Sequence, residues 1–186
     1  MLQIGCVILL ILLMTCTVNL VISQKRSIKQ SALLFAVFLV YAAGNLYFTI
    51  FSRQIGSGVI LEFRPLQIYT HLFEKSVDAG DTAIGFASKF LNATPPIVGL
   101  ILNILLYYPL GYLLPILFPK LKPRYVILIG CLCSIATEAT QYLLRMGWCE
   151  TDDVIHNTLG TAIGVWACRL QSKWLNKSKS NDLPKD

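Results

Sequence analysis

The chain has 186 residues, of which 55% are hydrophobic and only 14% are charged. A water-soluble domain of this size needs more charge on its surface, so the composition excludes an ordinary soluble protein. The net charge is +6, but the basic residues fall in short clusters between apolar stretches rather than along one helix face. The sequence therefore predicts a membrane protein that has no nucleic-acid partner.

Five stretches come close to the roughly 20 apolar residues that a helix needs to cross a bilayer. They predict an all-α, polytopic transmembrane helix bundle with spans at residues 2–23, 31–51, 97–118, 125–144 and 153–170. The first span is expected to be retained, because it lacks the basic start and the cleavage site of a signal peptide. We expect a first helix and linker over 1–30, a membrane domain over 31–170 and a disordered cytoplasmic tail over 171–186.

Lysine and arginine counts predict the orientation. The linkers 24–30 and 119–124 and the end from Arg169 hold three, three and five of the sixteen basic residues. Because cytoplasmic segments are enriched in these residues, the N-terminus is predicted outside and the C-terminus inside. The long connection over 52–96 then lies outside, and its amphipathic part at 72–91 is expected to form a surface or re-entrant helix.

Polar side chains within the spans are costly in a bilayer, so each needs a partner and is a functional candidate. On the fourth span, Glu138, Gln141 and Arg145 are spaced three and four apart, which stacks them on one helix face. A rise of about 1.5 Å per residue places one polar group from each of four spans at a similar depth, ~6–9 Å below the outer surface. These four, expected to face one another, are Asn45, Asn103, Glu138 and Asn157.

The sequence thus predicts one outward-facing polar pocket, with an arginine near its mouth. Its members are Asn45, Arg53, Asn103, Glu138, Gln141, Arg145, Asp153 and Asn157. The alternative interpretation is that these residues form interhelical hydrogen bonds that only hold the bundle together. A carboxylate and a guanidinium favour the pocket, since small apolar residues pack helices without the same cost of desolvation.

Small residues and prolines predict how the helices pack. Gly160 and Gly164 form a small-xxx-small pair on the fifth span, which is typical of close helix packing. Pro109 and Gly111 interrupt the third span, and a proline there frees a carbonyl one turn earlier, so we expect a kink.

The sequence favours neither a metal site nor a catalytic constellation. Asp152 and His156 are four apart and could join Glu138 around a metal, but a histidine in the first turn of a helix more often bonds locally. Ser134 precedes Glu138 by one turn, where a serine usually bonds back to its own helix. We therefore expect no metal and no cofactor, and we favour binding over catalysis.

Three strings resemble the VanZ-like family of bacterial integral membrane proteins: NILLYYPLGYLLP at 103–115, EATQ at 138–141 and DDVIHNTLGTAIG at 152–164. Arg53 also resembles an arginine that the family carries. The resemblance implies a multi-pass protein of the bacterial cytoplasmic membrane, and the namesake of the family is linked to resistance to teicoplanin-type glycopeptides. The positions that match the family motifs are Asn103, Pro109, Gly111, Glu138, Gln141, Asp153, Asn157, Gly160 and Gly164.

These observations lead to one main functional hypothesis and two alternatives. The main hypothesis is a protein among membrane lipids whose outward pocket binds a cell-envelope component, such as a lipid-linked precursor or a lipoglycopeptide, and contributes to glycopeptide resistance. The first alternative is an intramembrane enzyme acting on a lipid or lipid-linked phosphate, with Glu138 as general base and Arg145 steering the anion. The second is a structural membrane subunit.

Overall fold

The computed structural model describes residues 28–62, 65, 70 and 94–181. The first predicted span, at 2–23, and the amphipathic part at 72–91 lie outside these residues. The described elements are α2 (Ile28–Leu46), a π-helical turn η1 (Tyr47–Phe51), β1 (Gly58–Glu62), α5 (Thr94–Leu117), α6 (Pro123–Leu143), β2 (Met146–Glu150) and α7 (Thr151–Asn181).

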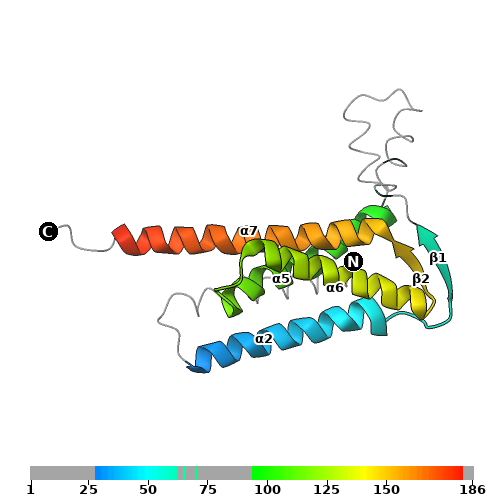
Figure 1. Cartoon of the computed structure of the whole chain (residues 1–186), viewed down its shortest axis with the longest axis horizontal. Coiled ribbons are helices and arrows are strands. Elements are labelled where there is room, and N and C mark those ends of the chain that lie inside the picture. Colours follow the sequence, from blue (N-terminus) through cyan, green and yellow to red (C-terminus); the bar gives the residue numbers. More distant parts are fainter. Residues whose placement is uncertain (1–27, 63–64, 66–69, 71–93, 182–186) are drawn as a thin grey trace.

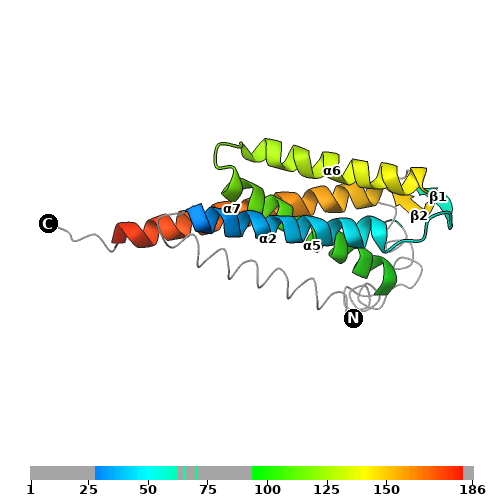
Figure 2. The same ribbon diagram turned by 90° about the horizontal axis from the view of Figure 1, so that it is seen from below.

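The helices lie side by side, with α2 and α6 running in one direction and α5 and α7 in the other (Figures 1 and 2). Three of them, Ile28–Phe51, Val98–Leu117 and Pro123–Leu143, are long and apolar enough to cross a membrane. These helices match the second, third and fourth predicted spans to within a few residues. The basic linker at 119–124 and the basic end of α7 lie at one end of the bundle, and the two strands lie at the other (Figure 1).

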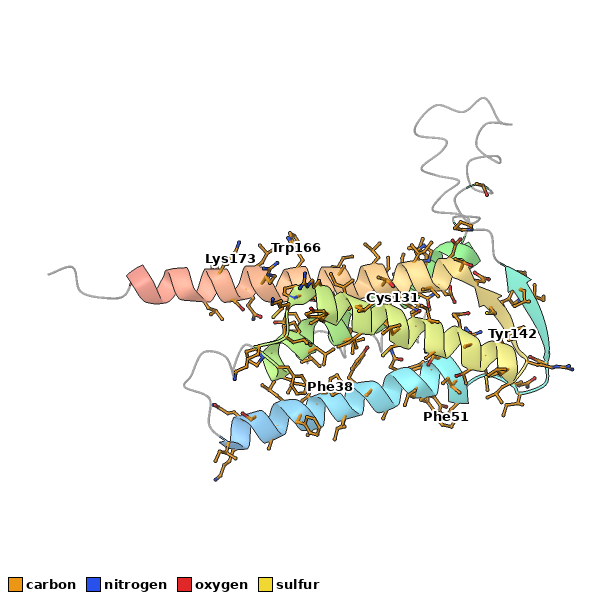
Figure 3. The ribbon with its side chains drawn as sticks, in the orientation of Figure 1. Phe38, Phe51, Cys131, Tyr142, Trp166 and Lys173 are labelled. Atoms are coloured by element: carbon orange, nitrogen blue, oxygen red, sulfur yellow. The ribbon has the colours of Figure 1, made fainter. Side chains whose placement is uncertain are left out.

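The helix α7 is longer than the predicted fifth span. Its composition is less apolar than that of α2, α5 and α6. It continues to Asn181, through much of the segment for which the polar composition predicted a disordered tail. Its large exposed apolar side chains are spaced three or four residues apart, so they form one stripe along the helix. This stripe consists of Ile155, Leu159, Ile163, Trp166, Leu170 and Trp174. Figure 3 shows Trp166 pointing away from the other helices.

The closest helix pair is α5 and α7, and glycines allow their backbones to approach. A Cβ atom added to Gly160 would lie 2.2 Å from the carbonyl oxygen of Ile104, and one added to Gly164 would lie 2.2 Å from that of Tyr108. A Cβ on Gly111 of α5 would likewise meet the backbone of Thr161 on α7. Side chains at these three positions would therefore force the two helices apart.

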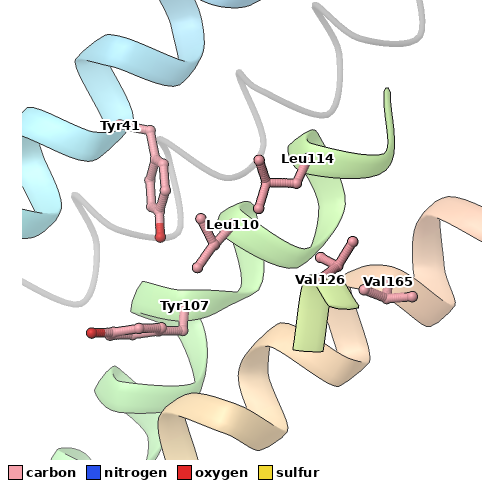
Figure 4. Close-up of a cluster of buried hydrophobic side chains, with 6 residues drawn as sticks. All are labelled: Tyr41, Tyr107, Leu110, Leu114, Val126 and Val165. Carbon is pink, nitrogen blue, oxygen red and sulfur yellow. The ribbon is translucent and has the colours of Figure 1, made fainter. Parts of the chain in front are cut away.

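Large buried side chains from four helices fill the rest of the core. Tyr41 of α2 lies above α5, whose Tyr107, Leu110 and Leu114 continue toward residues of α6 and α7 (Figure 4). Pro109 is itself fully buried, and α5 remains a single α-helix across it. The packing therefore places α5 at the centre of the bundle, between α2 and α7.

The two strands form a small parallel sheet that the sequence did not predict. Gly58 pairs with Met146 and Glu62 with Glu150. The strands are parallel because each follows a helix that runs in the same direction, β1 after α2 and β2 after α6. The sheet closes one end of the bundle and brings β2 over the beginning of α7 (Figure 1).

Candidate polar binding site

The carboxylate of Glu138 lies at the centre of the polar residues beneath the sheet. Its side chain is only 6% exposed. Its Oε2 accepts a hydrogen bond from the backbone N–H of Glu150, at 3.1 Å. The thiol of Cys149 donates to the backbone carbonyl of Glu138, at 3.6 Å. Strand β2 therefore covers Glu138 at this end of the bundle, and its backbone supplies a donor to the carboxylate.

Two further hydrogen bonds connect the neighbouring helices at this level. Asn103 of α5 donates to Oδ1 of Asp153 on α7, at 2.6 Å. Asn157 of α7 donates to the hydroxyl of Ser134 on α6, at 2.8 Å. The three helices α5, α6 and α7 thus each contribute polar side chains to one cluster around Glu138.

Two buried oxygen atoms in this region have no hydrogen-bond partner among the described residues. They are Oε1 of Gln141 and Oδ1 of Asn157, whose side chains are 2% and 3% exposed. A buried acceptor without a partner costs about 1–3 kcal/mol, so such an atom in a native protein calls for an explanation. Both atoms could accept a hydrogen bond from a hydroxyl or amide N–H of a bound molecule.

A guanidinium lies beside the two carboxylates. Arg53 is half-buried, donates from Nη1 to the carbonyl of Trp148 at 3.4 Å, and interacts electrostatically with both Glu138 and Asp153. The pKa of the Cys149 thiol depends on the balance of these charges. Burial, reinforced by the negative charges of Glu138 and Asp153, raises the pKa of Cys149 to about 11, and Arg53 opposes the shift. The acidic side chains outweigh the arginine at this thiol.

Two of the predicted pocket residues, Arg145 and Asn45, lie differently from the expectation, and Gln141 also bonds outside the predicted pocket. Arg145 does not continue the helix face of Glu138, because α6 ends at Leu143 and Arg145 adopts the left-handed conformation with φ 52° and is exposed. Gln141 donates across to the backbone carbonyl of Thr49 in η1, at 2.9 Å.

Asn45 faces a different part of the bundle. It donates to the carbonyl of Leu106, at 3.3 Å, and to the hydroxyl of Tyr41, at 3.4 Å. It also lines a cavity between α2, α5 and α6 whose lining includes neither Glu138 nor Asp153. The depth argument could not show on which side of α5 Asn45 lies.

The name carboxylate cluster is used below for the residues that the structure brings together beneath the sheet: Arg53, Asn103, Ser134, Glu138, Gln141, Asp153 and Asn157. Within the described part of the chain, no three His, Cys, Asp or Glu side chains are grouped so that they could hold a metal ion. Sequence reasoning missed Cys149, and no pattern signalled it, because its place depends on the pairing of β2 with β1.

Apolar helices of membrane-crossing length that surround a buried polar cluster define a multi-pass membrane protein. The sequence model of the VanZ/LLP1 family matches residues 4–172. The chain therefore belongs to this VanZ-like family, and the match extends from residue 4, in the first predicted span, to residue 172, in α7. No match is found among curated proteins, and none among solved structures.

Proposed function

We propose that the carboxylate cluster binds a polar, anion-bearing component of the cell envelope, such as a lipid-linked precursor or a lipoglycopeptide. The observation that carries the proposal is a combination of buried groups: two carboxylates, two amide oxygens that have no partner among the described residues, and Arg53 beside them. The acceptors suit hydroxyl and amide donors of a sugar or peptide. The arginine suits a phosphate or carboxylate.

The proposed side of the membrane follows from the basic residues. Those of the linker at 119–124 lie at the end of the bundle opposite the strands (Figure 1). Cytoplasmic segments are enriched in lysine and arginine, which supports an outward-facing cluster. The apolar stripe of α7 supports a further membrane crossing by that helix, since a lipid-exposed helix needs an apolar face along its length. A site on the outer face is accessible to molecules that act on the outer leaflet.

The proposal is tested by binding measurements on the full chain in lipid nanodiscs, with two probes, teicoplanin and undecaprenyl pyrophosphate. Removing a hydrogen bond to a charged group costs about 1.5–3 kcal/mol, so Glu138→Gln is expected to weaken binding by about tenfold or more. The variant is isosteric and retains an acceptor for the N–H of Glu150. If the wild type bound neither probe more tightly than this variant, the proposal would be wrong.

Arginine variants provide a matched control. Arg53→Gln is expected to weaken binding of the pyrophosphate, whereas Arg145→Gln, at an exposed position after α6, is expected to leave it unchanged. Equal effects of both variants would indicate a general attraction between surface charge and the probe rather than recognition by the cluster.

The same variants separate the two alternative functions. An intramembrane phosphatase would release phosphate from the lipid probe and lose this turnover in Glu138→Gln, with Arg53 in the anion-steering role first expected for Arg145. If the chain is a structural subunit, the wild type should bind neither probe. Glu138→Gln should then reduce expression or assembly.

A further inference from the structure

A second feature of the bundle is a cavity of about 390 Å³ enclosed by α2, η1, α5 and α6. Its lining shares no residue with the carboxylate cluster, although Tyr107 of the lining lies next to Ser134 and Glu138 of the cluster. Its walls come from three helices that are apolar enough to cross a membrane, so it lies at the depth of the lipid hydrocarbon. Its size falls within the range of about 300–1,000 Å³ that is typical of ligand sites.

The cavity opens between α2 and α6. Its floor is α5, with Tyr107 and Leu110, which Figure 4 shows beneath Tyr41 of α2. Leu46 on one rim is 48% exposed, and Ala136 on the other rim is also exposed. The opening therefore faces sideways, toward the membrane, rather than along the helix axis.

The polar atoms of the lining are already engaged within the protein. The hydroxyl of Tyr41 donates to the carbonyl of Leu106, at 2.9 Å. The hydroxyls of Tyr107 and Thr137 share a hydrogen bond, at 3.2 Å. The hydroxyl of Thr140 donates to the carbonyl of Ala136, at 2.8 Å. Among the described residues, the lining contains no Asp, Glu, Lys or Arg. An occupant therefore meets an apolar surface with few free donors or acceptors, which suits a hydrocarbon chain and not a polar headgroup.

The dimensions agree with one leaflet of the bilayer. The lining residues of α2 and η1 extend from Phe38 to Ile50, a length of about 18 Å at the helical rise of 1.5 Å per residue. One leaflet contributes about half of the ~30 Å hydrocarbon core. Next to the outermost lining residues, Gln141 bonds to Thr49 and joins α6 to η1, which closes the cavity toward the strands.

We infer that this cavity holds the hydrocarbon chain of a membrane lipid, taken from the leaflet on the side of the strands. The inference goes beyond the proposed function and does not depend on it. It would remain valid if the carboxylate cluster bound neither probe.

The test uses the full chain in phosphatidylcholine nanodiscs doped with a phosphatidylcholine that carries a photoreactive diazirine in the middle of one acyl chain. After illumination, mass spectrometry maps the labelled residues. We expect lining residues such as Cys133 and Ala136 to be labelled more heavily than lipid-facing residues of the same helix. Labelling no greater than that of exposed Leu132 would overturn the inference.

A pair of alanines on α6 provides a matched comparison. In Ala136→Trp the new side chain fills the cavity, so labelling of the remaining lining residues is expected to fall to the level of Leu132. Ala139 is exposed and does not line the cavity, so Ala139→Trp should retain the wild-type pattern. Ala42→Trp on α2 repeats the filling from the opposite wall, in case Ala136→Trp does not fold.

Two other occupants would give a different result. If the first predicted span, at 2–23, or a second copy of the chain filled the cavity, the lining would be protected from the lipid probe in the wild type. Oxidative or bifunctional crosslinking through the native Cys133 would then yield an internal link or a dimer. Either product, together with protection from the probe, would overturn the lipid assignment.

Discussion

The close approach of α5 and α7 leads to a specific prediction for Gly164. In Gly164→Ala, the new Cβ would lie 2.2 Å from the carbonyl oxygen of Tyr108, although contacts under 3.0 Å are essentially never seen for real Cβ atoms. The neighbour is backbone, so the helices must separate by about 1 Å, which forfeits up to about half of the dispersion energy at the adjoining contacts. Overpacking of this kind costs about 1–3 kcal/mol.

For a chain of this length, about 1–3 kcal/mol corresponds to a fall in melting temperature of ~2–12 °C. Thermal unfolding in detergent, followed by tryptophan fluorescence, measures the change. The control is Gly44→Ala in α2, where an added Cβ meets nothing within 4 Å. That variant should be neutral, or more stable by up to about 1 kcal/mol through helix propensity. Equal melting temperatures for the two variants would refute the packing argument.

Three further predictions follow from the two ends of the bundle and from its core. Since the pKa of Cys149 is raised from the ordinary 9.0 of a thiol to about 11, maleimide labelling at pH 8 should be roughly 100-fold slower than for a free thiol. Glu138→Gln removes a negative charge, lowers this pKa, and should speed the reaction. An impermeant maleimide at higher pH should label Cys149 in intact cells, but label Lys122→Cys only after the cells are opened, and the opposite pattern would reverse the topology. Tyr107→Phe loses the bond to Thr137 and should destabilise the protein by about 0.6–1 kcal/mol, whereas Tyr142→Phe, at an exposed position, should not change its stability.

The sequence predicted those features that depend on the composition of one segment or the spacing within one helix. Hydropathy alone located the spans that correspond to α2, α5 and α6, because a long apolar helix is recognisable without its neighbours. The family was also recognisable, since its motifs are short and local. Depth counting grouped Asn103, Glu138 and Asn157, and all three take part in the hydrogen bonds of the carboxylate cluster.

Features that depend on how segments meet were not predictable. Pairing of β1 with β2 depends on two segments more than eighty residues apart, and neither has a strand-like pattern strong enough to predict it. The end of α6 at Leu143 depends on the turn into β2, in which Arg145 and Gly147 both have positive φ. For the same reason, counting could not separate Asn45 from the cluster, because depth contains no information about which neighbour a helix faces.

The helix α6 separates the two proposed sites. Ser134, Glu138 and Gln141 form hydrogen bonds to α7, β2 and η1, respectively, whereas Ala136 and Thr140 line the cavity. Because Ala136 is two residues from Glu138 and therefore points to the other side of α6, a larger side chain at Ala136 should leave the Glu138 carboxylate in place. Ala136→Trp should therefore abolish labelling by the photoreactive lipid without changing the affinity for teicoplanin, and Glu138→Gln should do the reverse. If either variant altered both measurements to the same extent, the two sites would be one, and the bound molecule would extend from the cluster into the cavity.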